Sequence, residues 1–522
     1  MAINPSLQST RQTNALRPLH MNNQPRSGYR KYTLWLIAIT TLIRLALSSI
    51  VELNNDEVYY VTYAKYLQWN YFDHPPMVAV WIKFFTASLE LNNEFFVRMG
   101  SVLGAAISTW LIFLTGKKLK DNRTGWIAAC LFTASFYSSV IAGLLILPDS
   151  PQLTFWMLFV YLSVTIVQHK NRKQVNLRLI FLGLAAGFCI LSKVHGLFCW
   201  FGFGGYVLFC RRELLKNPFL YLGALLTIAI ITPSFLWSFS NQMGTYDYHS
   251  ERVTIRHLQL DSFIREIVGS FFYNGPVNVS LLIGALIAFR KKWQSVAILL
   301  WLGVPLIITV LFLSLFNDTL PHWSGPGYTT LILVTALHLS EKSLSFSTGI
   351  TRLSMGITAV ALAASICLIN YWPGTLGSKE QHEFGKHDVT LDMSGWRAFG
   401  KDFAALYHKD SATMHPRFIF NNYWFPAAHL DYYAARPLGL QLKAVGNLHD
   451  IHHFAWLNKK LPELKNGEDA YFISISNFND PVPEELKKKF EKISEAELIP
   501  QIRGGKTARY FYVYRLIGFK AE

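Results

Sequence analysis

Long apolar runs separated by short polar loops make up most of the first 370 residues of the chain. Many of these runs approach the roughly 20 apolar residues that a helix needs to cross the hydrocarbon core of a bilayer. The pattern predicts a polytopic α-helical membrane protein with about eleven transmembrane helices. The predicted spans cover residues 32–51, 95–116, 124–147, 151–168, 178–194, 196–210, 218–239, 266–289, 294–316, 326–340 and 349–371.

Basic residues in alternate loops predict which side of the membrane each loop faces. With the N-terminal arm in the cytoplasm, the inner loops all carry Lys or Arg; they are residues 116–123, 169–178, 211–216, 290–293 and 340–343. Cytoplasmic loops of membrane proteins carry such an excess of positive charge. The intervening loops, and everything after the last span, are therefore expected outside the cytoplasm.

The character of the chain changes after about residue 373, where charges become frequent and the long apolar runs stop. The segments RFIFNNYW, AYFISIS and ARYFYVYRLI are typical of strands, because aromatic and β-branched residues dominate them. GWRAFGKDFAALYHK and PVPEELKKKFEKIS are typical of helices. We therefore expect a cytoplasmic tail at 1–31, a transmembrane domain at 32–372 and a soluble extracytoplasmic α/β domain at 373–522.

The composition fits a membrane protein and explains the charge. Of the 522 residues, 51% are hydrophobic and 16% charged, against about 25% charged in soluble proteins. The net charge of +16 would suggest nucleic acid in a soluble protein, but many of the basic residues lie in the inner loops. The five cysteines lie in or beside apolar runs, so neither a disulfide framework nor a CxxC metal site is indicated.

Two adjacent carboxylates, Asp56 and Glu57, stand just beyond the first apolar run, at the outer boundary of the membrane. They are either solvated loop charges or functional groups, since ionisable groups at membrane depth are costly and tend to be functional. A carboxylate here would suit a general base acting on a hydroxyl. The segment DEVYYVTYAKYLQW is predicted to be a helix in the membrane interface, where Tyr and Trp favour the headgroup layer.

Two further outer loops carry candidates for phosphate or substrate contact. His74 precedes two prolines, and either His74 or Lys83 could meet a phosphate. Either Asp149 or Ser150 caps the helix that Pro151 begins, or Asp149 has a functional role. The two interpretations of Asp149 are equally open on the sequence.

The remaining outer loops add a lysine and two histidines. Lys193 either extends to the interface or holds an anionic phosphate as a fixed charge. His195 lies beside it, and His322 lies at another outer membrane boundary. A zinc site formed by these histidines and His74 is an alternative that no ligand spacing supports.

Four stretches, taken in order, resemble one family. They are DEVYYVTYAKYLQWNYFDHPPMVAVWIK, LPDSPQLTFWMLFVYL, GLAAGFCILSKVHGLF and PHWSGPGYTTLIL. Together they resemble the bacterial branch of the protein O-mannosyltransferase-like family, which is related to the lipid A aminoarabinose transferases, over roughly residues 30–370. These are GT-C fold glycosyltransferases that move a sugar from a polyprenyl phosphate to an acceptor outside the cytoplasm.

The resemblance implies roles for individual residues. Asp56, with Glu57 beside it, matches the acidic motif of the first outer loop and would activate the acceptor hydroxyl for an inverting displacement. Lys193 would be the first choice for the phosphate contact, since aminoarabinose transferases have a lysine where this chain has His74. Asp149 would contact the sugar or the acceptor. Further candidates for substrate contact are Tyr59, Tyr60, Asp73, His195 and His322.

The expected chemistry requires no cofactor. A lipid phosphate is already a good leaving group, so a base and nearby positive charge are enough; a divalent metal is an unsupported addition. The expected partners are a polyprenyl-phosphate sugar, a protein, lipid or glycan acceptor, and membrane lipids, without nucleic acid. The resemblance favours a bacterial inner membrane.

Two other functions compete with this interpretation. A transporter or flippase would also place charges within the membrane, but on both faces of the helix bundle. A repeat of two halves would support it, and no clear repeat is seen in the sequence. A membrane protein that only binds or assembles a partner would leave the acids on one face unexplained.

Overall fold

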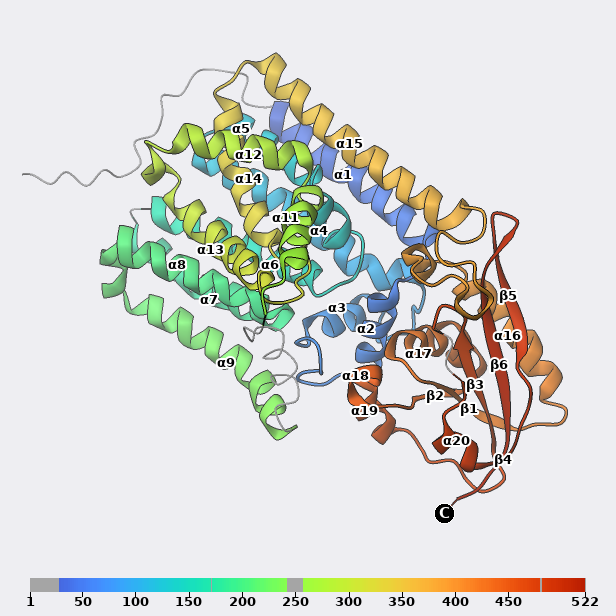
Figure 1. The fold of residues 1–522 in the computed structure, drawn as a ribbon. Helices are drawn as coiled ribbons and strands as arrows, with labels where there is room; N and C mark the ends of the chain where they lie inside the picture. Colours follow the sequence, from blue (N-terminus) through green and yellow to red (C-terminus); the bar gives the residue numbers. More distant parts are fainter. Residues whose placement is uncertain (1–27, 170, 242–256, 479–480, 522) are drawn as a thin grey trace, which may run out of the picture.

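The structure, a computed structural model, describes residues 28–169, 171–241, 257–478 and 481–521. Most of the predicted tail at 1–31 lies outside these ranges, and the first helix, α1, begins at Gly28. Seven described helices are long and apolar enough to cross a membrane: α1 (Gly28–Ile50), α4 (Glu94–Leu119), α6 (Asp149–Gln168), α7 (Arg172–Ser192), α9 (Pro218–Ser240), α13 (Ala297–Ser314) and α15 (Leu344–Tyr371). The chain is a multi-pass membrane protein (Figure 1).

The other predicted spans also fall on helices, but these are shorter or broken. They are α5 (Asn122–Thr133), α8 (Leu197–Cys210), α14 (Gly325–Ser340), and the pair α11 (Leu260–Tyr273) and α12 (Pro276–Phe289). Counting the pair, which meets at a 99° bend, as one span raises the number of long spans from seven to eight. The expectation of eleven full-length spans is therefore not confirmed.

The sequence explains both interruptions. In the predicted span 124–147, the hydroxyls of Ser138 and Ser139 donate to the carbonyls of Phe132 and Thr133 at the end of α5. These bonds replace helical N–H donors, and a π-helix (Tyr137–Ile141) follows. Between α11 and α12, Gly275 has φ 89° and Pro276 starts the next helix, so the chain turns sharply there.

The first outer loop forms two short helices, α2 (Asn55–Lys65) and α3 (Met77–Phe85). The prediction that α2 lies in the membrane interface stays a prediction, because burial inside the protein explains its tyrosines equally well. Tyr59 and Tyr63 are buried, and Tyr59 packs against Trp424 of the C-terminal domain with ring centroids 4.9 Å apart. Aromatic residues suit a domain junction as well as a headgroup layer, so composition alone did not separate the two settings.

The C-terminal region contains a six-stranded mixed sheet in the order β2-β1-β3-β6-β4, with β5 also paired to β6. β1 is parallel to β2 and β3, and β6 is antiparallel to β3, β4 and β5. The strands are β1 (Pro416–Asn421), β2 (Gln441–Ala444), β3 (Asp469–Ile475), β4 (Phe490–Ile493), β5 (Glu497–Arg503) and β6 (Lys506–Phe519). β3 is buried along its whole length, as expected for a central strand.

Helices cover this sheet. Of the two helices that the sequence predicted for this domain, one is much shorter than predicted. The observed helices are α16 (Trp396–Asp410), α17 (Trp424–Leu430), α18 (Leu448–Ile451), α19 (Phe454–Leu457) and α20 (Glu484–Lys488). The predicted helix over residues 481–494 is only the five-residue α20, followed by β4. Pairing of Phe490 with Phe519 draws the second half of that segment into the sheet, so tertiary contacts outweigh local helix preference.

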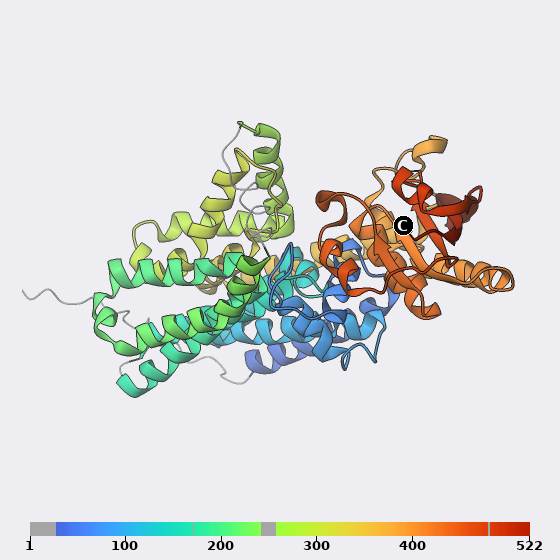
Figure 2. The same ribbon diagram turned by 90° about the horizontal axis from the view of Figure 1, so that it is seen from below.

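The C-terminal domain lies against one end of the helix bundle. Figures 1 and 2 both show α2 between the membrane helices and the sheet domain. The two helices α2 and α17 are in direct contact. Helix α2 of the first outer loop therefore lies between the two parts of the chain.

Candidate active site

The first turn of α2 is set by its own sequence. The Asn54 side chain accepts a hydrogen bond from the Glu57 N–H (2.9 Å), and the Asn54 N–H donates to the Glu57 carboxylate (3.0 Å). This capping box fixes where the helix begins. It places Asp56 and Glu57 in the first turn, about 100° apart around the helix, so the two carboxylates face different surroundings.

Glu57 is fully buried and paired with Arg98 of α4. Arg98 donates to both carboxylate oxygens, from Nε at 2.7 Å and from Nη2 at 2.5 Å. The backbone N–H of Ile146 also donates to Glu57, at 2.9 Å. These contacts tie α2 to α4 and to the turn before α6, which gives Glu57 a structural role. Its predicted catalytic role stays a prediction.

Asp56 differs from Glu57 in exposure and in side-chain contacts. Its side chain is exposed, and it makes no hydrogen bond or ion pair within the described part of the chain. Removal of water by the surrounding protein, and then the charge of Asp73, raise the pKa of Asp56 to about 6. Asp392 and Glu57 act in the same direction, and Lys193 in the opposite one. We call Asp56, Asp73, Asp392 and Lys193 the Asp56 site.

Asp149 forms a buried ion pair with Lys193 of this site. The Lys193 Nζ donates to the Asp149 Oδ2 at 2.8 Å, and the Tyr137 hydroxyl donates to Oδ1 at 3.2 Å. Asp149 makes no side-chain cap to α6, so the capping alternative is wrong. Lys193 is 4% exposed and paired, so the alternative of a side chain extended to the interface is also wrong.

His322 completes this cluster, and His195 lies nearby. The His322 Nε2 is 3.9 Å from the Asp149 Oδ2. Burial, and then the positive charge of Lys193, lower the pKa of His322 to about 4, so its ring is neutral near pH 7. His195 packs against Trp323, with ring centroids 5.5 Å apart, and its charge also acts on Asp149. The four predicted residues Asp149, Lys193, His195 and His322 therefore gather in one place.

Asp73 joins the first outer loop to the C-terminal domain. Its Oδ2 accepts hydrogen bonds from the hydroxyls of Tyr59 (2.7 Å) and Tyr63 (2.9 Å), and its Oδ1 is 3.3 Å from the His452 Nδ1. Burial opposes ionisation of Asp73, but the hydrogen bond and charge of His452 outweigh it and lower the pKa of Asp73. Asp73 is thus an ionised residue at the domain junction.

The remaining predicted residues lie around this core. Tyr60 is buried, and its ring centroid is 5.8 Å from that of His74. His74 is half-buried, and its charge contributes to the low pKa of Asp73. Lys83 is half-buried in the last turn of α3, and none of the contacts described above reaches it.

Several residues of this region were not identified from the sequence. Arg98 and Glu266 are charged residues inside predicted apolar runs, which is the signal that could have pointed to them. Glu266 is buried and accepts hydrogen bonds from Thr319 (2.9 Å) and Ser270 (3.0 Å). Asp392 and His429 come from the C-terminal domain, where no local pattern marks them.

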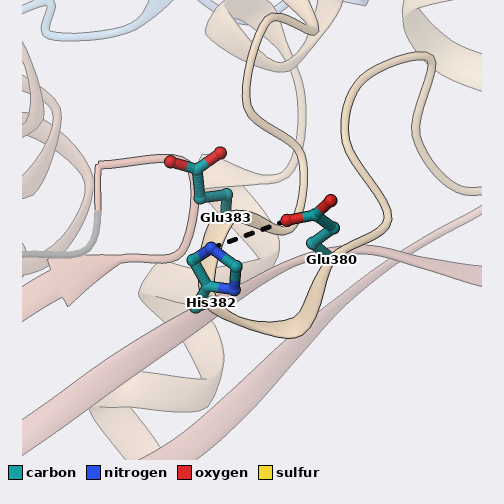
Figure 3. A group of neighbouring side chains, drawn as sticks. All are labelled: Glu380, His382 and Glu383. Carbon is teal, nitrogen blue, oxygen red and sulfur yellow. Dashed lines mark ion pairs between the residues drawn. The ribbon is translucent and has the colours of Figure 1, made fainter.

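One group of side chains in the described ranges has the geometry to hold a metal ion: Glu380, His382 and Glu383 (Figure 3). It lies in an exposed loop after α15, outside the Asp56 site, and Glu383 is also paired with Lys386. The three outer-loop histidines His74, His195 and His322 do not form such a group among the described residues. The fold therefore offers no support for the zinc alternative built on them.

Comparisons with known proteins agree with the family resemblance of the sequence. A profile of the family "Dolichyl-phosphate-mannose-protein mannosyltransferase" matches residues 73–237. The "undecaprenyl phosphate-alpha-4-amino-4-deoxy-L-arabinose arabinosyl transferase" of Pseudomonas aeruginosa (strain LESB58) is 29% identical over 64% of this chain. The protein of that description from Erwinia tasmaniensis is 25% identical over 64% of it. The matches span 62% and 61% of those relatives' lengths, which is less than two thirds.

The fold comparison covers nearly the whole chain. ArnT from Cupriavidus metallidurans bound to undecaprenyl phosphate superposes with a TM-score of 0.65 over 94% of this chain and 98% of that one, at 15% identity. The chain therefore has the GT-C fold of this structure. The apo form of ArnT gives a TM-score of 0.62 over 93% of this GT-C chain and 98% of that one, at 14% identity. The GT-C fold thus extends through the C-terminal domain.

Proposed function

We propose that this protein is an inverting glycosyltransferase that moves a sugar from a polyprenyl-phosphate donor to an acceptor hydroxyl outside the cytoplasm. Three findings support this function: the GT-C fold, the family relationship, and an outer-loop site with a carboxylate, a lysine and histidines. The names of the similar arabinosyl transferases include undecaprenyl phosphate. An undecaprenyl-phosphate sugar is therefore the first donor to test.

The single observation that carries the proposal is the state of Asp56. Of the two adjacent acids, Asp56 is the one whose carboxylate makes no hydrogen bond or ion pair within the described structure. The other, Glu57, is held by Arg98. A raised pKa near 6 makes a carboxylate a stronger base than an ordinary aspartate, and still leaves it ionised at neutral pH. Asp56 therefore meets the two requirements of a general base.

The proposed reaction is a single displacement. Asp56 takes the proton of the acceptor hydroxyl as that oxygen attacks the anomeric carbon. The bond from the anomeric carbon to the phosphate oxygen breaks, and the electron pair leaves with the polyprenyl phosphate. Attack from the face opposite the leaving group inverts the configuration of the anomeric carbon.

Lys193 is the proposed contact for the departing phosphate. It is a fixed positive charge in a site shielded from water, where charge stabilisation is strongest. It is close enough to Asp56 for its charge to lower the pKa of that residue. Asp149 holds Lys193 in place at 2.8 Å and His322 lies on the other side of Asp149. We assign these side chains to the donor end of the site.

The acceptor and the orientation follow from the same proposal. Lipid acceptors are the first to test, since the four sequence stretches resemble a family related to the lipid A aminoarabinose transferases. The basic inner loops support an orientation in which the Asp56 site and the C-terminal domain lie on the outer side of a bacterial inner membrane. Tyr59, Tyr60, Asp73 and His74 would then line the path of the acceptor to Asp56.

The test is transfer by purified protein in proteoliposomes, with undecaprenyl-phosphate aminoarabinose as donor and lipid A as acceptor. The Asp56→Asn protein should lose transfer by about 100- to 10,000-fold, the usual contribution of a general base. Asp402→Asn, at an exposed site on α16, is the matched control and should keep full transfer. Full transfer by Asp56→Asn would exclude Asp56 as the base.

A further inference from the structure

Three of the four residues before Asp56 are held by the C-terminal domain, from parts of the chain more than 330 residues away. The Glu52 carboxylate accepts hydrogen bonds from the backbone N–H groups of Trp396 (2.8 Å) and Arg397 (3.1 Å), at the start of α16. The Leu53 N–H donates to the Tyr433 hydroxyl at 3.0 Å. The segment that leads into α2 is therefore fixed by the second domain as well as by its own capping box.

Asn55, next to Asp56 in the chain, makes two contacts to that domain through its side-chain amide. Its Oδ1 lies 2.9 Å from the His429 Nε2, and its amide is hydrogen bonded to the Asp392 carboxylate. A carbonyl oxygen only accepts, so the His429 Nε2 carries the proton and donates it. Both contacts restrict the Asn55 side chain.

His429 is itself locked in orientation. Its ring stacks on the Trp396 indole, with centroids 4.0 Å apart and planes 3° from parallel. The Arg509 guanidinium covers the same indole at 4.1 Å from its centroid. Burial, and then the charge of Arg509, lower the pKa of His429 well below its usual value, so the ring is neutral. Its Nδ1 is buried and makes no hydrogen bond within the described residues.

We propose that His429 and Asp392 are positioning residues that hold Asn55, and through it keep Asp56 at a fixed place in the site. The proposal rests on the proposed role of Asp56 as base. A single residue of α2 separates these contacts from the reacting carboxylate, and Asp56 itself has no side-chain partner to orient it within the described residues. Its position therefore depends on its backbone, which the C-terminal domain holds.

A merely structural interpretation is that these contacts only dock the domain. Docking is already supplied elsewhere, by the ion pair of Arg397 with Glu94 (2.6 Å) and that of Lys65 with Asp431 (3.4 Å). A buried, stacked histidine whose one hydrogen bond reaches the residue beside the base is more specific than docking requires. The two interpretations predict different kinetics.

The test compares purified His429→Leu, His429→Gln and Asp392→Asn proteins with the controls His408→Gln and Asp402→Asn, which change exposed residues of α16. The assay uses undecaprenyl-phosphate aminoarabinose and lipid A, with kcat and the donor KM measured separately. His429→Leu should lower kcat by about 10- to 100-fold, the effect of a displaced reacting group, and leave the donor KM unchanged. His429→Gln keeps an N–H donor of similar reach and should restore part of kcat.

The pH profile adds a readout that docking would not move. The charged groups that act on Asp56 are Asp73, Asp392, Glu57 and Lys193. Asp392→Asn removes one negative charge, so the acid limb of kcat/KM should move to lower pH. An unmoved acid limb together with a His429→Leu kcat equal to that of His408→Gln would overturn the proposal.

Amide hydrogen exchange separates this proposal from the proposed function. His429→Leu should speed exchange at residues 53–58 while β3 and β6 stay protected. If wild-type protein transfers no sugar, the proposed function fails, and unchanged exchange at residues 53–58 would then refute the positioning role as well. If exchange is faster but kcat is unaltered, the positioning role fails while the proposed function stands.

Discussion

Arg98 donates two hydrogen bonds to the carboxylate of Glu57, at 2.7 and 2.5 Å, with both side chains fully buried. The adjacent Asp56 has an exposed side chain and no such partner within the described residues. The capping box at Asn54 produces this difference, because it directs Glu57 back to the start of the helix and toward α4. Of the two neighbouring acids, one is thus held by a buried ion pair, and the other is the one we propose as the base.

Glu57→Gln is predicted to damage the fold rather than the chemistry. The change leaves the buried Arg98 guanidinium without its counter-ion, which typically costs about 3–5 kcal/mol. The thermal unfolding temperature in detergent should drop markedly, while kcat of the remaining folded protein should change little. Glu90→Gln, at an exposed position of the first outer loop, is the control. An unchanged unfolding temperature would show that the pair does not stabilise the protein.

The pH dependence of transfer should report the Asp56 carboxylate. Because its pKa is raised to about 6, kcat/KM should rise with pH through that value and then level off. The raised pKa also means that the folded state binds more protons than the unfolded state between about pH 4 and 6, so ionised Asp56 destabilises the fold. Asp56→Asn should therefore raise the unfolding temperature above pH 6 while lowering transfer by the factor given above. A lowered unfolding temperature would contradict this sign.

Changes at Asp149 and Lys193 should act in opposite directions on donor binding. Lys193→Gln removes the proposed phosphate contact and should weaken undecaprenyl phosphate binding by about 10-fold or more, as expected for a hydrogen bond to a charged group. Asp149→Asn removes the carboxylate that competes with the phosphate for Lys193 and should tighten binding. Titration of tryptophan fluorescence with undecaprenyl phosphate measures both. Weaker binding in both variants would indicate that the pair is only structural.

Acidification should loosen the junction between the two domains. His453 is buried there and accepts a hydrogen bond from the Phe72 N–H at 3.2 Å. Burial lowers the pKa of His453 to about 3, far below the ordinary value near 6.5. Between these values the separated state binds a proton that the docked state excludes. Docking should therefore weaken as pH falls below 6.5, by about 1.4 kcal/mol per pH unit for this group.

Tryptophan fluorescence can follow this transition, because the His453 ring stacks on Trp456 with centroids 5.5 Å apart. His453→Gln removes the titrating group and should flatten the transition between pH 6.5 and 3. His415→Gln, which leaves the junction intact, should keep it. An equal transition in both variants would assign the effect to other groups, among which the buried His429 is the first candidate.

Chemical labelling of single-cysteine variants can test the proposed orientation in the membrane. In a background without the five native cysteines, Asp402→Cys on α16 should react with a membrane-impermeant maleimide from the outer side. Lys173→Cys, in a basic loop expected inside, should react only after the membrane is permeabilised. Both residues are exposed, so accessibility differs only through the membrane. The reverse labelling pattern would invert the proposed topology.

The sequence predicted the architecture well and the contacts of the site only in part. Hydrophobic runs fall on helices throughout the membrane domain, because apolar composition is a direct consequence of the lipid environment. Strands at RFIF, AYFISI and RYFYVYRLI also agree with β1, β3 and β6. The interruption at Ser138–Ser139 and the small extent of α20 depend on side-chain bonds and distant strand pairing, which no local pattern records.

The same distinction holds for the site. The outer-loop residues Asp149, Lys193 and His322 were expected on one face from the loop count alone, and the fold brings them together. The burial of Glu57 could not be read from an exposed-looking pair, since it requires Arg98, 41 residues away. The contributions of Asp392 and His429 depend on packing between regions more than 330 residues apart, which is beyond any motif.

The hydrogen bonds that hold residues 52–55 also have a consequence for biosynthesis. Their partners, Trp396, His429 and Tyr433, are synthesised more than 340 residues after them. The membrane helices can insert one after another as they emerge from the ribosome, but the loop that carries Asp56 must wait for the last quarter of the polypeptide. A nascent chain already embedded in the membrane is therefore expected to be inactive until residue 433 has been added, and any truncation before that residue should yield an inserted but inactive protein.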